Sequence, residues 1–431
     1  MESGDQTILD RPGASTNAAG AIDSGSRPER SRAVPARRPA RVWGWAAFVS
    51  VIALGIGVAW FASGGRANPD RLWAEAERAF LAGRWDRARD LLKTLERMRP
   101  RSPLDWLLEG QLATAEGRLD DALAALGRIP DSHAMAAQAH LLAGRIERQR
   151  RRVREAETAF RRALELKPGL VEAHKELIYI LGIQSRRREV DAEFHELARL
   201  TPLTHHDLFT WALTHFTAWG PDISGDLESF IQADPDDRFS RLALANLLID
   251  HPGEEAKVER ILQPLPEDDP EAQALRIELK LNHGQVDEAL AMLARAPSRH
   301  PHLARLRGRV ALRRGDSAGA IRHFQDALSD EPYDRVSIAE LGKALVLQGD
   351  RSAAERYLTH AKQLDDVYNL INRIRRPGSE NQPPDLTKLG RACEAAGLVD
   401  EARGWYMLAI SRDPLDAEAQ QAVHRLRPLV P

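Results

Sequence analysis

Histidine and carboxylate side chains gather in one short stretch, THHDLFTWALTHF, at residues 204–216. It offers His205, His206, Asp207 and His215 as possible metal ligands. On a helix, separations of nine and ten residues place His215 about two and a half turns from the paired histidines. A tetrahedral metal site needs its ligands around one centre, so this segment alone predicts no metal site. Four aromatic residues of the region are expected to lie in a core instead: Phe209, Trp211, Phe216 and Trp219.

Other catalytic patterns are incomplete. His195 and Glu196 begin the zinc motif H-E-x-x-H, but Arg199 stands where the second histidine is needed. The single cysteine, Cys393, excludes an intramolecular disulfide framework and is expected to be a small buried helix residue. The sequence contains no glycine-rich phosphate-binding motif. We therefore expect no catalytic, cofactor-binding or metal-binding residue.

Composition narrows the possible partners. The chain of 431 residues is 43% hydrophobic and 29% charged, with a formal net charge of −2. This length suffices for a sizeable core. The nearly balanced charge argues against a protein that binds nucleic acid through a basic surface. No nucleic-acid partner is expected.

The N-terminal part differs from the rest of the chain. Residues 1–41 hold few large apolar side chains and are expected to form a disordered cytoplasmic tail. Residues 42–62 follow, a stretch of 21 residues without a charge. As a helix it spans about 31 Å, enough to cross a lipid bilayer. Six arginines within residues 27–41 predict a cytoplasmic N-terminus and an extracytoplasmic remainder. A cleaved signal peptide is the alternative, although the apolar stretch is longer than the core of such a peptide.

A small residue followed four positions later by a large one recurs every 34 residues. The pairs are Ala88/Leu92, Ala122/Leu126, Ala156/Phe160 and Val190/Phe194, and the small residue returns at Ala289, Ala320, Ala354 and Ala402. Five residues before the first four small residues, a turn between two helices is expected, at Gly83, Gly117, Arg151 and Ser185. Further upstream, small residues let one helix approach its partner closely: Gly110, Gly144, Gly308, Gly342 and Gly390.

This pattern resembles the tetratricopeptide repeat (TPR), a helix-turn-helix unit of 34 residues. Trp106 and Gly110 match the first helix of that family, and EAETAFRRALELKP at residues 155–168 matches the second. The resemblance covers roughly residues 70–430. It implies an all-α fold, a right-handed α-solenoid of about ten TPR-like helix pairs behind one transmembrane helix.

The repeat register divides the chain. We expect a linker at 63–69, TPR repeats 1–4 at 70–202, two degenerate repeats at 203–269, TPR repeats 7–9 at 270–366, an insertion at 367–384, the last TPR repeat at 385–414, and a capping helix and tail at 415–431. The degenerate repeats keep helical spacing but lose the motif.

The resemblance also implies a groove, lined by the first helices, that binds peptides or partner helices. Its positions carry over in the early repeats to Trp73, Phe80, Leu107, Leu141, Arg145, Arg148, Lys175 and Tyr179, and in the late repeats to Arg305, Arg309, Arg313 and Lys343. Apolar anchors beside cations predict an acidic, partly apolar protein segment as the partner. Alternatively, these cations are solvated or paired with neighbouring Glu and Asp.

A second basic feature recurs directly after the turns, at Arg84, Arg118, Arg152 and Arg186. Stacked repeats would place these arginines along one edge. There they would either bind an anionic partner or lie in solvent and complement a helix C-terminus.

The sequence therefore predicts a membrane-anchored TPR scaffold, without cofactor, that recruits or assembles envelope proteins at the extracytoplasmic side of a bacterial inner membrane. The alternatives are an enzyme or metal-binding protein with a site in the degenerate repeats, and a cytoplasm-facing TPR adaptor.

Overall fold

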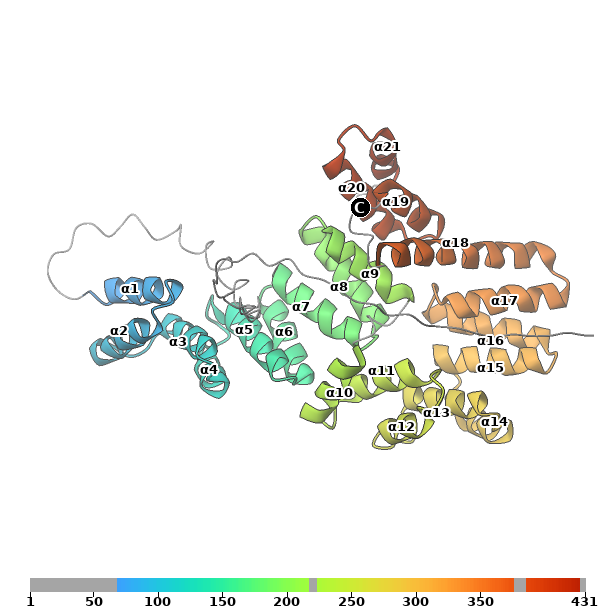
Figure 1. Cartoon of the computed structure of the whole chain (residues 1–431), viewed down its shortest axis with the longest axis horizontal. Coiled ribbons are helices and arrows are strands. Elements are labelled where there is room, and N and C mark those ends of the chain that lie inside the picture. The colour runs from blue at the N-terminus through green and yellow to red at the C-terminus, as the bar shows by residue number, and fades with distance from the viewer. Residues whose placement is uncertain (1–67, 217–222, 376–384, 427–431) are drawn as a thin grey trace, which may run out of the picture. The chain divides into compact units, whose positions relative to one another are not determined.

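Helices make up all the regular secondary structure in the computed structural model, which describes residues 68–216, 223–375 and 385–426. Figure 1 shows them following one another along the chain. The expected all-α solenoid is confirmed. None of the described helices is long and apolar enough to cross a membrane. The predicted tail and the predicted span at 42–62 lie outside the described residues.

The first four helix pairs follow the 34-residue register. Their bounds are α1 (Pro69–Leu81), α2 (Trp85–Met98), α3 (Pro103–Ala115), α4 (Leu119–Leu126), α5 (Ala136–Gln149), α6 (Val153–Leu166), α7 (Val171–Ile183) and α8 (Arg187–Leu200). In each pair the turn between the two helices lies at the predicted residue, which adopts a positive φ: 69° at Gly83, 76° at Gly117, 65° at Arg151 and 56° at Ser185. This conformation lets the second helix return beside the first.

Close contact within a pair depends on a small residue of the first helix. A Cβ atom built on Gly144 of α5 would lie 2.5 Å from the Phe160 ring of α6, and one on Gly110 of α3 would lie 2.8 Å from Leu126 of α4. Such distances are shorter than van der Waals contact, so only glycine permits this approach. The predicted role of these glycines is confirmed.

The degenerate middle departs from regular pairing. It forms α9 (His205–Phe216), α10 (Ile223–Ala233), α11 (Arg238–Leu248) and α12 (Glu255–Leu262). Helix α10 packs against α11, and α11 packs against α12. Helix α9 instead packs against α8 and against two helices far along the chain, α18 (Arg351–Arg375) and α20 (Val399–Arg412). All of these helices belong to one compact unit, Ala67–Pro431.

Paired packing resumes after the middle. The remaining helices are α13 (Pro270–Asn282), α14 (Val286–Arg295), α15 (Pro301–Arg313), α16 (Ser317–Asp330), α17 (Arg335–Gln348), α19 (Leu386–Ala395) and α21 (Ala417–Arg425). Helix α18 continues to Arg375, eight residues beyond the expected start of the insertion at 367. Val367 and Ile371 of this extension are buried at helical spacing from Leu364, which is also buried, and this explains why the helix does not end earlier.

Candidate interaction surfaces

The four arginines of the predicted basic edge occupy equivalent positions but have different surroundings. Each is the N-terminal capping residue of a second helix. Arg84 and Arg152 are exposed. Arg118 pairs with Glu116 and with Asp121. The side chain of Arg186 is only 10% exposed. The helix register therefore aligns these residues, but it does not make them one accessible basic surface.

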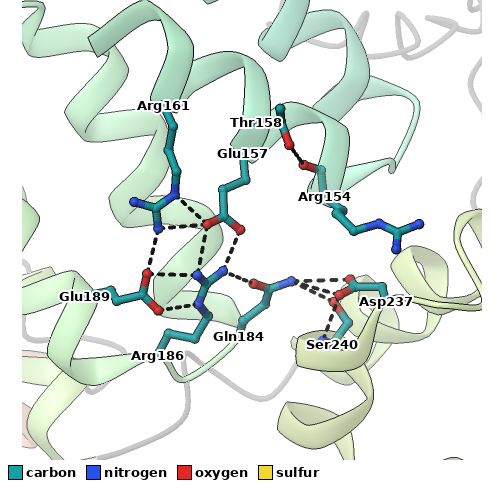
Figure 2. A network of polar contacts seen from close by, with 9 residues as sticks. All are labelled: Arg154, Glu157, Thr158, Arg161, Gln184, Arg186, Glu189, Asp237 and Ser240. Atoms are coloured by element: carbon teal, nitrogen blue, oxygen red, sulfur yellow. Dashed lines mark hydrogen bonds and ion pairs between the residues drawn. The ribbon is translucent and has the colours of Figure 1, made fainter. Parts of the chain in front are cut away.

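Arg186 is the centre of a polar network between α6, the turn before α8, and α11 (Figure 2). Its Nη2 donates to Glu157 at 2.9 Å, its Nε donates to Glu189 at 2.8 Å, and its Nη1 donates to Gln184 at 3.2 Å. Arg161 donates to the same two carboxylates. Burial alone would raise the pKa of Glu157, but hydrogen bonds and positive charge from Arg186 and Arg161 lower it.

Gln184 extends this network into α11. Its Nε2 lies 3.3 Å from Oδ2 of Asp237 and 3.2 Å from Oγ of Ser240, and all three residues are buried. Burial raises the pKa of Asp237. The guanidinium of Arg186 also lies over the ring of Phe239, 4.0 Å from its centroid. We call this set the Arg186 network; it ties the fourth repeat to the degenerate middle and leaves Arg186 no face for a partner.

Arginines around the third turn make similar internal ion pairs. Arg150 lies 2.9 Å from Asp120 of the preceding pair. Arg151 lies 2.7 Å from Asp226 of α10, and Arg154 lies 2.9 Å from Asp234 beyond the end of α10. The sequence showed the arginines, but the partners of Arg151 and Arg154 lie 75 and 80 residues away, outside the repeat register.

Two apolar residues of the predicted groove are buried, so their predicted role in partner binding is wrong. Leu107 is 8% exposed and Leu141 is 0% exposed, and both lie in the hydrophobic core. Neighbouring repeats cover these side chains, so neither can contact a partner. Trp73 and Phe80 of α1 are half-buried and stay partly accessible.

The cations of the early groove are paired with carboxylates on the next repeat. Arg145 donates to Glu176 at 2.7 Å, and Nε of Arg148 lies 3.0 Å from the other oxygen of that carboxylate. Arg148 also lies over the Tyr179 ring, 5.2 Å from its centroid. Lys175 donates to Asp207 at 3.2 Å. The alternative interpretation of paired cations therefore holds in this part.

In the late groove, one buried carboxylate lies close to three basic side chains. Glu278 of α13 accepts from Arg309 at 2.7 Å, bonds His302 Nε2 at 2.7 Å, and lies 3.8 Å from Arg305. Arg305 also lies 3.5 Å from Asp334. Burial alone would raise the pKa of Glu278, but the hydrogen bond to His302 and the charges of Arg305 and Arg309 lower it to about 2. These contacts join α13, α15 and the start of α17.

The next turns of α15 and α17 are accessible. Arg313 is exposed at the end of α15, and Lys343 of α17 is exposed beside Glu340, to which it donates at 2.7 Å. Val346 is 50% exposed and Leu347 is 67% exposed, three and four residues after Lys343. Residues at this spacing share one helix face. These two apolar residues are not among the predicted groove positions, although their spacing from Lys343 is visible in the sequence.

The histidine segment serves packing and helix capping. Asp207 accepts hydrogen bonds from the backbone N and the hydroxyl of Thr204, which caps α9. His205 packs against Trp405, and His206 is exposed. Within the described ranges, no three His, Cys, Asp or Glu side chains are grouped to hold a metal ion. Cys393 is fully buried, and burial raises the pKa of its thiol well above the ordinary value.

An open polar hollow of about 1110 Å³ lies between the extended part of α18 and α19. Its lining includes Asn369, Arg373, Lys388 and Arg391. Arg391 is already paired with Glu418, at 2.6 Å. Asn369 and Arg373 belong to the predicted insertion, whose residues 376–384 lie outside the described structure.

The comparison with known protein families agrees with this arrangement. The tetratricopeptide-repeat family model matches residues 74–132, 107–171 and 275–335. Among solved structures, the human IFIT1 dimer with PPP-AAAA is 16% identical, over 84% of this chain and 86% of that one, with a TM-score of 0.33. The TPR domain of P58(IPK) is 16% identical, over 84% and 97%, with a TM-score of 0.27. A tetratricopeptide-repeat protein of Parabacteroides merdae is 18% identical, over 64% and 98%, with a TM-score of 0.27.

The curated proteins include no match to this chain. Proteins built from tetratricopeptide repeats bind protein partners, and the repeats here indicate a protein-interaction scaffold. The 34-residue helix pairs, their turn residues and their glycine contacts agree with the family match, and residues 74–171 and 275–335 are tetratricopeptide repeats.

Proposed function

We propose that this protein is a non-catalytic, membrane-anchored scaffold that holds a protein partner on the exposed part of its late groove. The observations that carry the proposal are the exposure of Arg313 on α15 and of Lys343, Val346 and Leu347 on α17, a helix that packs against α15. We call these four residues the late-groove surface. It combines two exposed cations with two exposed apolar side chains. Lys343 pairs only with the neighbouring Glu340 on its own helix, at 2.7 Å, whereas the cations of the early groove pair with carboxylates of the next repeat.

The chemistry of this surface fits an acidic, partly apolar segment of the partner. Burial of Val346 and Leu347 against apolar side chains supplies affinity. Carboxylates beside Arg313 and Lys343 supply specificity and speed association. Glu278 and Asp334 already hold Arg305 and Arg309, so these two cations position the helices and contribute less to the partner.

The location of the scaffold rests on the sequence. The uncharged stretch at 42–62 and the arginines before it support a single-pass anchor in a bacterial inner membrane, with the repeats outside the cytoplasm. A reporter that is active only outside the cytoplasm, fused after Pro431, should then be active. Activity of a cytoplasmic reporter alone would favour the cytoplasm-facing adaptor.

Site-specific crosslinking tests the binding surface. A photoreactive residue at position 347 of the full-length protein should crosslink one partner in native membranes. The double variant Arg313→Glu and Lys343→Glu should lose most of that product because its charges repel an acidic segment. Arg322→Glu is the matched control, since Arg322 is exposed on the second helix α16 and its reversal should leave the product unchanged. Equal crosslinking by all three proteins would exclude the late-groove surface from partner binding.

A further inference from the structure

Helix α9 joins two parts of the chain that are far apart in sequence. Its Leu208, Ala212 and Leu213 lie in one buried cluster with Leu389 and Trp405. Trp211 of the same helix stacks on Phe194 of α8, with 5.0 Å between the ring centroids, and belongs to a different buried cluster. One side of α9 therefore packs in the buried cluster that includes α8, and another side packs in the buried cluster that includes α18, α19 and α20.

The approach of α9 to α20 requires a glycine. A Cβ atom on Gly404 would lie 2.4 Å from Cδ2 of Leu208. Gly404 lies in the interior of α20, where glycine costs about 1 kcal/mol relative to alanine in an unconstrained helix. Close packing of Leu208 against the α20 backbone accounts for its presence.

Two histidines flank this contact. His195 of α8 bonds Asp400 of α20, with 3.1 Å between Nδ1 and Oδ2, and its ring lies edge-on to Trp211. His205, at the start of α9, lies edge-on to the fully buried Trp405 of α20, with 5.6 Å between centroids. The Nε2 atom of His205 is buried and has no hydrogen-bond partner within the described part of the chain.

We propose that these contacts form a pH-responsive clasp, in which a charged His195 and a neutral His205 hold α8 and α9 against α20. The charged form of His195 makes an ion pair with Asp400, which a neutral ring cannot make. A charged His205 would place a cation beside the apolar rings of Phe209 and Trp405, in a position where its buried Nε2 has no acceptor.

The electrostatic surroundings give the direction of each effect. The hydrogen bond to Asp400, then the charges of Asp400, Glu401 and Asp191, raise the pKa of His195 against the opposing effect of burial. Arg403 of α20 also faces Asp400, at 3.8 Å, and moderates the pair. Burial, followed by repulsion from Arg412 and His206, lowers the pKa of His205.

These two shifts bracket the ordinary histidine pKa of 6.5. His195 stabilises the clasp fully below 6.5, and this contribution is lost as pH rises through its raised pKa. His205 stabilises the clasp above 6.5, and this contribution is lost as pH falls through its lowered pKa. The clasp should therefore be tightest near pH 6.5 and should loosen in both directions. Because the His195 side chain is 45% exposed, solvent weakens its ion pair with Asp400 and makes the loss of stability at alkaline pH smaller.

Hydrogen exchange of the full-length protein between about pH 5 and pH 9 tests the clasp. After correction for intrinsic exchange rates, protection of α9 and of the start of α20 should be greatest near pH 6.5. Each unit of pKa shift corresponds to at most about a tenfold loss of protection. His195→Asn keeps a donor at the Nδ1 position without a charge, so this variant should lose the fall in protection on the alkaline side. His205→Phe keeps an aromatic contact and should lose the fall on the acid side.

The control is His140→Gln, which removes another histidine–carboxylate pair, with Asp131 at 2.8 Å, away from the clasp. This variant should keep the fall in protection both above and below pH 6.5. Helices α3 and α4 provide an internal reference for unfolding of the whole chain. The clasp would be wrong if α9 and α20 followed α3 and α4 at every pH, or if either clasp variant kept the side of the profile that it should lose.

Discussion

Gly144 of α5 and Phe160 of α6 contact so closely that a single added methyl group does not fit. A Cβ atom on Gly144 would lie 2.5 Å from Cε1 of Phe160, and Gly308 and Phe324 repeat the relationship at 2.6 Å. In both pairs the residues are sixteen positions apart, with the turn between them. The aromatic ring fills the space that the missing side chain leaves, and this sets the distance between the two helices.

Gly144→Ala should lower the free energy of unfolding by about 1–3 kcal/mol, because the Phe160 ring must leave its position to avoid the new methyl group. Chemical denaturation of the full-length protein measures the effect. Gly225→Ala on α10 is the control, since no atom lies within 4 Å of its added Cβ. This control should be neutral or stabilising by up to about 1 kcal/mol. Equal effects of the two substitutions would contradict the packing described here.

Ser185→Gly should stabilise the protein. Ser185 has a φ of 56°, a conformation that costs a non-glycine residue about 1–2 kcal/mol. Glycine relieves this cost but adds flexibility to the unfolded chain, so the net gain should be about 0.5 kcal/mol. The reverse change at the equivalent turn, Gly117→Ser at a φ of 76°, should destabilise by a similar amount. A denaturation midpoint that falls for Ser185→Gly would show that the serine makes a contact worth more than the strain.

Arg186→Ala should destabilise the protein much more than Arg84→Ala, although both residues occupy the same position in the repeat. Loss of Arg186 leaves Glu157 and Glu189 without their main partner in the Arg186 network, at a cost of about 3 kcal/mol. Arg84 is exposed, so its replacement should change the free energy of unfolding by less than about 0.5 kcal/mol. Similar denaturation curves for the two variants would mean that the network contributes little to stability.

The Glu278 cluster should make stability depend on acid pH. The pKa of Glu278 is about 2 in the folded protein and 4.5 ordinarily, so its contribution is present above 4.5 and is lost as pH falls toward 2. The size is on the order of 3 kcal/mol. Burial lowers the pKa of His302, whose contribution is likewise lost on acidification, beginning below 6.5.

Urea denaturation at several pH values checks this prediction. Glu278→Gln should be less stable than the unmodified protein at neutral pH and should show a flatter dependence below about pH 4.5. The control Glu418→Gln removes an exposed carboxylate that pairs with Arg391, and it should keep the acid dependence. An unchanged slope for Glu278→Gln would assign the acid sensitivity to other carboxylates.

The binding surfaces could be predicted only in part. The helix positions of Arg145, Arg305 and Lys343 followed from the register, but the carboxylates beside them did not. Leu107 and Leu141 have the spacing of groove residues and are nevertheless in the core, because neighbouring repeats cover them. Exposure depends on how closely successive pairs stack, and a repeat pattern does not contain that distance.

The sequence by itself determined the repeating unit: its 34-residue period, its turns at residues such as Gly83 and Ser185, and the glycines that let the two helices of a pair approach closely. These features are local, since each pair is built from residues less than one repeat apart and its spacing is visible directly. Tertiary structure alone decided which equivalent residues are buried, as with Arg186 and Arg84, and where α9 packs. His195 meets Asp400 and Leu208 meets Gly404 across about 200 residues of chain, and such contacts leave no period in the sequence because they occur once and depend on the path of all the helices between them.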